Sequence, residues 1–287
     1  MQNKEIDSSK IKILVCCHKK CDLPQADYFL PVYVGAAITV KDFVMQRDDQ
    51  LNGEPCDNIS DKNKNYCELT AMYWAWKNIK KLYPDLEYIG LNHYRRYFKF
   101  SKIFSRIAKF KADSEASTYV LNKNKIQKLL NRKNIIIAES NIYPYSLAVD
   151  YSVAHISEDL RTLMKIVHDM YPDYDEIMYD FFYKNNKLSH YNMFIATWQF
   201  FDEYCTWLFS ILFEAERRLD ISNYSDIQKR IWGYMAERLF NVYLIYNKSK
   251  IKPYPVYIYN NRKESFFHYF INRIRYSIGF NISKRVN

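Results

Sequence analysis

The residues with the clearest chemical potential stand together at the end of one predicted strand. Tyr88 to Leu91 is a short apolar run suited to a buried strand, and it is followed by the polar sequence Asn92-His93-Tyr94-Arg95-Arg96. Polar side chains just past the carboxyl end of a strand are the usual place for ligand binding in α/β proteins. Two arginines there favour a phosphate-bearing ligand, because guanidinium groups make forked contacts that lysine cannot make. A solvated surface or a structural ion pair is the alternative interpretation.

A helix and a loop upstream are predicted to position this strand end. Asn65 precedes apolar residues at helical spacing, and Glu68 stands where the acid of a capping box belongs, so a helix is expected to begin there. The pattern ends at Pro84. The polar stretch 46–64 is predicted to be a loop that brings Asp57 and Asn58 toward the same region.

A second group of polar residues follows the first predicted strand. Lys12 to Cys17 is a buried-strand candidate, and it is followed by His18 and Lys19. Such a strand end is where many nucleotide-binding α/β domains contact a base or ribose, and a basic surface loop is the alternative. Leu30 to Val34 is predicted to be a second short strand.

Composition limits the classes of protein that fit. With 287 residues and 48% hydrophobic residues, the chain can form a large core. Only 5 glycines are present and no glycine-rich phosphate loop occurs, so a nucleotide must be held in another way. The formal charge of +10 suits nucleotides, nucleic acid or an anionic membrane. The six cysteines lack zinc-site spacing and are expected to be reduced thiols of a cytoplasmic protein, since neither a signal peptide nor a membrane-spanning run is present.

The middle of the chain adds further elements and candidate residues. Residues 99–118 are predicted to form a flexible loop or lid, Lys123 to Asn131 a helix, and Ile135 to Ala138 a strand. Ser157 is expected to cap the next helix, with His155 and Asp159 beside its start. An acid at a helix start is favoured by the helix dipole, so a structural role for Asp159 remains open.

The later part of the chain is predicted to be mainly helical. His190 to Ala196 is an apolar strand with polar residues at its beginning, and a long helix from about Trp198 to Leu219 follows it. A second helix, from Ser225 to about Tyr246, contains the adjacent pair Glu237 and Arg238. These two residues could form a structural ion pair, and they could also serve to hold a general base in place.

The last segment differs in charge from the rest. Between residues 261 and 287, six basic residues stand against Glu264 alone, which gives a net charge of +5. Aromatic and aliphatic residues lie at helical spacing between these charges. A basic amphipathic helix of this kind is typical of a surface membrane anchor, and a terminal helix docked on the core is the alternative.

Several motifs together resemble one known family. The sequences DNIS, NYCELTAMYWAWKN, YIGLNHYRRYF, HISEDL, HYNMFI and AERL are similar to those of bacterial capsular and exopolysaccharide glycosyltransferases. That group was long catalogued as a domain of unknown function and includes galactofuranosyltransferases. The resemblance runs from about Lys12 to Asn247, with the motifs in the family's order.

The resemblance implies an α/β fold of the glycosyltransferase A type, a Rossmann-like mixed sheet flanked by helices with a helical C-terminal portion. We therefore expect a catalytic domain over residues 1–247, with a nucleotide-sugar half at about 11–140 and an acceptor half at 141–247. Residues 248–287 are expected to form a basic amphipathic tail that binds the inner face of the cytoplasmic membrane peripherally.

The resemblance also implies a reaction, in which a sugar passes from a UDP-sugar to a polysaccharide or lipid-linked glycan. Because the group includes galactofuranosyltransferases, the sugar we expect is galactofuranose, transferred from UDP-galactofuranose with inversion. Where the fold usually has a metal-binding Asp-x-Asp motif, this chain has the His93-to-Arg96 run, so we expect Arg95 and Arg96 to replace the metal. A divalent metal held by Asp57 and His93 is the alternative.

The roles of single residues follow from the same resemblance. The general base is expected to be Glu237, with Asp159 and His190 as the next candidates. His155 and Tyr191 are assigned to the acceptor. The residues assigned to the nucleotide sugar are His18, Lys19, Asp57, Asn58, His93, Arg95, Arg96 and Asn192.

Three alternatives of other kinds accompany this expectation. One is retaining transfer of a pyranose such as galactose or glucose. Another is a catalytically silent member of the family. The third is a non-enzymatic basic protein that binds nucleic acid, which no nucleic-acid-binding motif in the chain supports.

Overall fold

A computed structural model of the chain describes residues 7–39, 43–100, 110–111, 113–121, 123–260, 271, 273–278 and 280. The chain divides into two compact units. The first comprises Met1–Glu139, Asn192–Cys205 and Lys250–Lys263, and the second comprises Ser140–Tyr191, Thr206–Ser249 and Glu264–Asn287. The first unit is discontinuous because strands from three parts of the chain complete one sheet. Contiguous halves divided near residue 140, as expected from the sequence, do not describe this arrangement.

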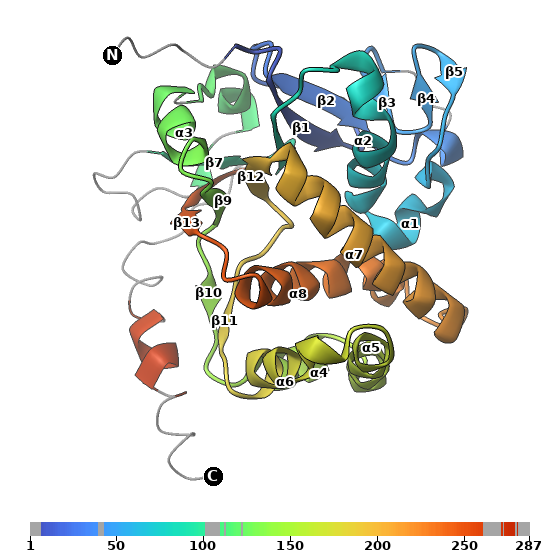
Figure 1. Ribbon diagram of the computed structural model, residues 1–287, viewed down its shortest axis with the longest axis vertical. Coiled ribbons are helices and arrows are strands. Elements are labelled where there is room, and N and C mark those ends of the chain that lie inside the picture. The colour runs from blue at the N-terminus through green and yellow to red at the C-terminus, as the bar shows by residue number, and fades with distance from the viewer. Residues whose placement is uncertain are drawn as a thin grey trace. The chain divides into compact units, whose positions relative to one another are not determined.

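The first unit is built on a mixed sheet with helices against it (Figure 1). The main path of the sheet has the order β13-β9-β12-β6-β1-β2-β3. Neighbouring strands in this path are parallel except that β12 is antiparallel to both β6 and β9. The bounds of the seven strands, in chain order, are β1 Ile11–Cys17, β2 Phe29–Tyr33, β3 Gln46–Arg47, β6 Tyr88–His93, β9 Ile135–Ala138, β12 Phe194–Thr197 and β13 Ile251–Tyr254.

The central strands are buried, as their continuous apolar sequences predict. Every residue of β1 and of β9 is buried. β6 pairs with β1 in parallel and with β12 in antiparallel register, so hydrogen bonds hold it on both sides. The predicted strands at Lys12–Cys17, Tyr88–Leu91 and Ile135–Ala138 are confirmed, and β6 continues through Asn92 and His93.

A small extension of the sheet lies beyond the end of β6. β7 (Arg96–Phe98) folds back on β6 with His93 opposite Arg96, so Tyr94 and Arg95 form the turn between the two strands. β14 (Val256–Tyr259) pairs with β7, and β8 (Phe110–Lys111) pairs with β14. A separate hairpin is formed by β4 (Gln50–Leu51) and β5 (Glu54–Pro55), in the stretch expected to be a loop.

The helices of the first unit are α1 (Asn63–Tyr66), α2 (Leu69–Leu82) and α3 (Lys123–Leu130). The expectation of one helix beginning at Asn65 is wrong. Cys67 has a φ of 53°, which interrupts the helical path and separates α1 from α2. Glu68 is the residue before α2, but its side chain makes no capping hydrogen bond. Half of the expected lid, residues 101–109 and 112, lies outside those described, and its last part, Asp113–Thr118, is a 3-10 helix.

The second unit is mainly helical. It contains α4 (Leu147–Ala154), α5 (Ser157–Met170), α6 (Asp175–Tyr183) and α8 (Ile231–Tyr246), together with the short hairpin of β10 (Asn141–Ile142) and β11 (Lys187–Leu188). α7 (Trp198–Arg218) begins in the first unit and ends in the second. Stacked aromatic rings form part of the core, with ring centroids of Tyr174 at 3.7 Å from Tyr246 and 4.9 Å from Trp207.

Two helix starts differ from the sequence expectations. Ser157 is the first residue of α5 rather than its cap, which is Ile156. The helix expected from Ser225 begins at Ile231, after a 3-10 turn over Gln228–Arg230.

The predicted tail does not begin at residue 248. Residues 251–254 and 256–259 are the strands β13 and β14, whose backbones pair with β9 and β7. Of the amphipathic segment, residues 271, 273–278 and 280 are described and helical, while the others lie outside the described residues. Within the described part of the chain, no helix has the length and apolar character needed to cross a membrane.

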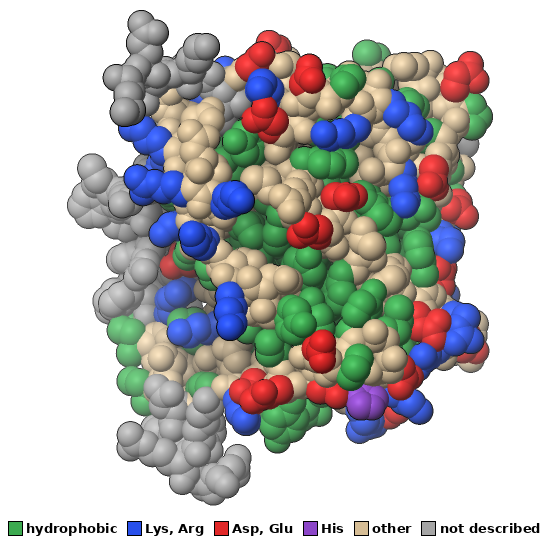
Figure 2. Space-filling model, in the orientation of Figure 1, with side chains coloured by type: hydrophobic (Ala, Val, Ile, Leu, Met, Phe, Trp, Pro, Cys, Tyr) green, Lys and Arg blue, Asp and Glu red, His purple; other side chains and the backbone are tan. Residues whose placement is uncertain are grey.

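The charged side chains on the face shown in Figure 2 include both signs, with Asp and Glu side chains lying among those of Lys and Arg. This face therefore does not consist of basic side chains alone. A local concentration of positive charge is found instead at one pocket of the first unit.

Candidate functional site

The pocket lies where β1 and β6 end. The two strands are parallel, with Cys16 beside His93, so the residues that follow each strand meet at one edge of the sheet. The Tyr94 main-chain N–H donates a hydrogen bond to the Cys16 carbonyl at 3.2 Å, which ties the turn after β6 to the end of β1.

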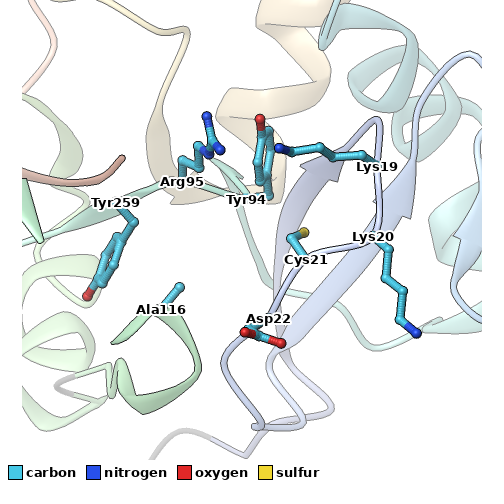
Figure 3. Close-up of a pocket in the computed structure, with 8 residues that line it drawn as sticks. All are labelled: Lys19, Lys20, Cys21, Asp22, Tyr94, Arg95, Ala116 and Tyr259. Carbon is cyan, nitrogen blue, oxygen red and sulfur yellow. The ribbon is translucent and has the colours of Figure 1, made fainter. Parts of the chain in front are cut away.

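The cavity has a volume of about 190 Å³ and is shown in Figure 3. Four segments supply its walls: the residues after β1, the turn between β6 and β7, the 3-10 helix Asp113–Thr118, and the end of β14. The lining residues are Lys19, Lys20, Cys21, Asp22, Tyr94, Arg95, Ala116 and Tyr259. Three cationic side chains against Asp22 leave the lining positively charged, which suits an anionic ligand.

Tyr94 is the centre of the cationic side of the pocket. The Lys19 Nζ lies 5.7 Å and the Arg95 Cζ 5.2 Å from the centroid of its ring. His18 meets the same ring edge to face, with centroids 5.1 Å apart. In Figure 3, the amino group of Lys19 points toward Tyr94, whereas Lys20 extends away from the other lining residues.

The position of Arg95 is fixed through its backbone. Its carbonyl accepts a hydrogen bond from the Tyr259 N–H at 2.9 Å, and Tyr259 itself is 2% exposed. β14 therefore supports the turn from one side while β1 supports it from the other. Such two-sided support reduces the freedom of the turn, which favours a preorganised binding site.

Sequence reasoning identified some residues of this pocket and missed others. Lys19 and Arg95 line it, His18 contacts its tyrosine, and His93 and Arg96 lie in the adjoining strands. The missed residues are Lys20, Cys21, Asp22, Tyr94, Ala116 and Tyr259. Tyr94 lies inside the arginine motif that the sequence reveals. Tyr259 has no nearby motif, because pairing between strands more than half of the chain apart brings it to the pocket.

Asp57 and Asn58 lie in a different loop and are not among the residues that line the pocket. The Asp57 carboxylate accepts a hydrogen bond from the Tyr73 hydroxyl at 3.1 Å, and its carbonyl accepts one from the Asn78 side chain at 2.8 Å. The Asn58 side chain bonds the Cys56 carbonyl and the Ser60 N–H, which stabilises its own turn. These contacts give both residues structural roles.

Asn192 joins the start of β12 to α2. Its Nδ2 donates to the Glu68 carboxylate at 2.8 Å, and its side chain is almost completely buried. Asn192 has a φ of 51°, which asparagine tolerates better than most residues. Asn92 in β6 is also buried, and neither of its amide atoms has a hydrogen-bond partner among the residues that the structure describes.

The second unit brings together another set of predicted residues around Glu237. One of its carboxylate oxygens accepts a hydrogen bond from the Tyr191 N–H at 2.7 Å. The other lies 3.4 Å from the His190 Nδ1, and the His190 Nε2 is 2.6 Å from the Tyr143 hydroxyl. Glu237, His190 and Tyr143 thus form a connected chain of polar side chains.

The charge of Glu237 is strongly favoured by its surroundings. Burial opposes ionisation, but the hydrogen bond and charge of His190, the charge of Arg238 and the Tyr191 N–H lower the pKa of Glu237 to about 2. A carboxylate with so low a pKa is a weak proton acceptor. Glu237 therefore fits the role of orienting His190 at least as well as it fits the role of a general base that acts alone.

Arg238 and His155 lie in the same unit. Arg238 is 3% exposed, with its Nη2 at 3.5 Å from the Asp150 carboxylate. His155 packs between the rings of Tyr151 and Tyr234, with centroids at 4.8 and 4.1 Å. Burial, followed by the charge of Arg238, lowers the pKa of His155 to about 4, so this imidazole is neutral at neutral pH.

Asp159 has a hydrogen-bond partner of its own, Tyr224. Its carboxylate is 2% exposed and accepts a hydrogen bond from the Tyr224 hydroxyl at 2.6 Å. Burial raises the pKa of Asp159, although the Tyr224 hydrogen bond opposes that shift. These contacts favour a structural role over a catalytic one.

Metal ligands do not gather in the described residues, where no group of three or more His, Cys, Asp or Glu side chains could hold an ion. In the pocket, Asp22 is the only carboxylate among the lining residues and it stands with three cationic side chains. This set of side chains does not fit a divalent cation.

Comparisons with known proteins place these observations in a family. A family model described as "Domain of unknown function (DUF4422)" matches residues 12–248. A solved structure of the bifunctional glycosyltransferase WbbM in its apo form is similar, with 28% sequence identity and a TM-score of 0.72. The match covers 88% of this chain and 46% of the WbbM chain, so this chain spans about half of that protein's length. No curated protein matches the chain.

Proposed function

The chain belongs to the family described as a domain of unknown function (DUF4422), and on this premise we propose that it is a glycosyltransferase that uses a nucleotide sugar. The observation that carries the proposal is the cationic pocket of Lys19 and Arg95 around Tyr94, at the edge where β1 and β6 end. The likeness to WbbM supports glycosyl transfer in general.

The pocket suits the diphosphate of a UDP-sugar. Arg95 offers a planar group that can bind two phosphate oxygens at once, and Lys19 adds a compact positive charge on the other side of Tyr94. In glycosyl transfer, negative charge grows on the diphosphate as the bond to the sugar breaks. Fixed cations at that place stabilise the transition state more than the bound donor.

Aromatic rings supply the second requirement of the donor. Tyr94, which lies between the two cations and next to His18, supplies an aromatic contact for uracil or ribose. Tyr259 contributes a further aromatic wall to the cavity. The combination of aromatic wall and cations matches a ligand that joins a planar base to a diphosphate.

We assign no catalytic step to a metal. Three of the four charged side chains at the pocket are cationic, which does not fit a divalent ion. In our proposal Arg95 therefore takes the electrostatic role, with Arg96 in the adjoining strand. A metal held by Asp57 and His93 is the alternative. Asp57 has two hydrogen-bond partners in α2, Tyr73 and Asn78, which makes it the weaker candidate.

For the general base, we propose the pair of His190 and Glu237. Glu237 stays charged and holds one ring nitrogen of His190, so the imidazole is kept in one orientation. Its other nitrogen, near the Tyr143 hydroxyl, is then the atom that takes a proton. Tyr191 and His155, which lie in the same unit, remain our candidates for acceptor binding.

The sugar and the acceptor are the finer parts of the proposal. Galactofuranose transferred with inversion from UDP-galactofuranose follows from the motif resemblance, and a pyranose such as galactose or glucose transferred with retention is the alternative. The acceptor is a surface-polysaccharide or lipid-linked glycan. The proposed place of action is the inner face of the cytoplasmic membrane.

The test is release of UDP from UDP-galactofuranose, UDP-galactose and UDP-glucose by the purified protein, with and without galactose-terminated glycans as acceptors. We expect release from one of these donors, reduced about a hundredfold or more in Arg95→Ala. Arg161→Ala, which alters an exposed ion pair with Glu158 in the second unit, serves as the matched control and should retain activity. Product anomer analysis by NMR separates inversion from retention.

Absence of UDP release from any donor, in a protein that also fails to bind UDP, would contradict the proposal. A protein that instead binds polynucleotide with a steep salt dependence would support the nucleic-acid alternative.

A further inference from the structure

Two cysteines lie next to each other at the pocket. Cys17 is the last residue of β1, and Cys21 lines the cavity four positions later. Their sulfur atoms are 4.0 Å apart. We propose that Cys21 is a peroxide-reactive thiol and that it forms a reversible disulfide with Cys17, which changes the shape of the pocket.

The two thiols have the unequal environments that such a reaction needs. Cys21 is partly exposed and lines the pocket beside Lys19 and Arg95, whereas Cys17 is completely buried. The side-chain hydrogen bond shared with Cys17, and then the charges of Lys19 and Arg95, lower the pKa of the Cys21 thiol against the opposing effects of burial and of Asp22. The Cys21 hydrogen bond and burial raise the pKa of Cys17. The exposed thiol is therefore the nucleophile and the buried one resolves the intermediate.

The chemistry is balanced by hydrogen peroxide as the oxidant. The Cys21 thiol first releases its proton, and the resulting thiolate attacks one peroxide oxygen. The O–O bond breaks, which gives a sulfenic acid and a hydroxide ion, and the hydroxide takes up the released proton to become water. The Cys17 sulfur then attacks the Cys21 sulfur, the S–O bond breaks, and a second water leaves with the proton of Cys17. Two thiols are oxidised to one disulfide and one peroxide is reduced to two waters.

The structure indicates which residue must move. A disulfide requires the sulfur atoms to approach from 4.0 Å to about 2 Å. Cys17 is held in the sheet, where its carbonyl accepts a hydrogen bond from the Val34 N–H. Cys21 lies in the irregular segment 20–26 between β1 and β2. The movement is therefore in the Cys21 segment, and it carries Lys20 and Asp22, which also line the cavity.

Three of the other four cysteines provide internal comparisons. Cys16 and Cys205 are buried, and burial raises the pKa of each thiol. Cys56 is partly exposed, as Cys21 is, but burial raises its pKa as well. Cys56 is thus the matched control for a partly exposed thiol outside the pocket.

The sequence makes the disulfide easy to detect. Lys19 and Lys20 lie between the two cysteines, so trypsin separates the peptide ending at Lys19 from the one beginning at Cys21. After treatment of the full chain with hydrogen peroxide and blocking of free thiols, we expect the two peptides to remain linked and to separate on reduction with a dithiol. Fragmentation between Cys16 and Cys17 assigns the bond.

Three further measurements make the test decisive. In the untreated protein, Cys21 should react with iodoacetamide at least tenfold faster than Cys56. Lys19→Gln should slow that reaction several-fold, and Cys21→Ser should abolish the linked peptides while Cys56→Ser leaves them. Equal alkylation rates for Cys21 and Cys56, or oxidation of Cys21 to sulfinic acid without linked peptides, would overturn the proposal. None of these readouts depends on glycosyl transfer, so a failure of the proposed function leaves them valid.

Discussion

Glu237 is charged although only 16% of its side chain is exposed. Because its surroundings favour the charged form, the free energy of unfolding should depend on whether Glu237 is ionised. Its ordinary pKa of 4.5 is lowered to about 2 in the folded protein, despite burial, by His190, Arg238 and the Tyr191 N–H. A lowered pKa contributes stability that is present above the unfolded pKa and is lost as the pH falls toward the folded pKa.

We predict that Glu237→Gln lowers the free energy of unfolding at pH 7 by about 1.5–3 kcal/mol, because hydrogen bonds to a charged group are lost. The difference between variant and parent should shrink as the pH falls from about 4.5 toward 2. Urea titrations at several pH values measure both effects. Glu158→Gln, which changes an exposed carboxylate in the same unit, is the control and should have little effect. A destabilisation that stays constant down to pH 3 would contradict this account of the charge.

His155 gives a second prediction at this scale. Burial and the charge of Arg238 lower its pKa to about 4, so its ring should show no protonation between pH 8 and pH 5.5 in NMR spectra. The exposed His168 is the comparison, because its hydrogen bond to Asp175 raises its pKa above the ordinary value of 6.5. Titration of His155 near pH 6.5 would contradict its burial between Tyr151 and Tyr234.

At the scale of elements, β6 is the strand on which the pocket depends, and Gly90 is its most restricted position. A Cβ at Gly90 would lie 2.9 Å from the Phe194 carbonyl oxygen and 3.0 Å from the Ile195 Cγ1, both in β12. The first of these atoms belongs to the backbone, so the two strands would have to separate to make room.

We predict that Gly90→Ala lowers the free energy of unfolding by at least about 2 kcal/mol. Gly53→Ala is the matched control. Gly53 has a φ of 86° but open space around it, so that substitution should cost about 1 kcal/mol through backbone strain alone. Chemical denaturation of both variants gives the comparison. A smaller loss for Gly90 than for Gly53 would contradict the close pairing of β6 with β12.

The same strand shows what sequence could and could not predict. The apolar run of β6 and the arginines after it can be recognised from the sequence, because a buried strand and a short motif are both encoded by neighbouring residues. The break at Cys67 was not, since a positive φ at a cysteine has no local sequence signature. The position of Tyr259 could not be predicted, because the sequence around it gives no sign of a strand beside Arg95. The pairing of β14 with β7 brings Tyr259 next to Arg95.

At the scale of the whole molecule, the C-terminal segment, residues 261–287, is the part of the chain that we expect to bind a membrane. Among its described residues, the side chains of Ile271, Ile274 and Ile278 are exposed, as is Arg275. An apolar face beside basic residues suits an anionic membrane surface. In contrast, the Arg273 side chain donates to the Ser140 carbonyl at 3.1 Å, which ties the segment to its own unit.

We predict that deletion of residues 261–287 lowers binding to vesicles containing anionic phosphatidylglycerol, as measured by co-sedimentation. Neutral phosphatidylcholine vesicles are the control and should bind little of either protein, because the attraction of basic residues requires anionic lipid. The truncated protein should keep its response to UDP, since the pocket is built from other residues. Equal sedimentation of the full and shortened chains would assign the segment a purely structural role.

We propose that Arg95 holds the diphosphate of a uridine nucleotide without a metal, and thermal unfolding with UDP tests this role of Arg95. At UDP concentrations about a hundredfold above the dissociation constant, the parent protein should be stabilised by about 2.7 kcal/mol, with or without EDTA. Arg95→Ala should lose most of this shift, Arg95→Lys should recover only part of it because lysine binds as a point charge, and Arg161→Ala should keep it. A shift that disappears with EDTA, or one that is unchanged in Arg95→Ala, would contradict the claim.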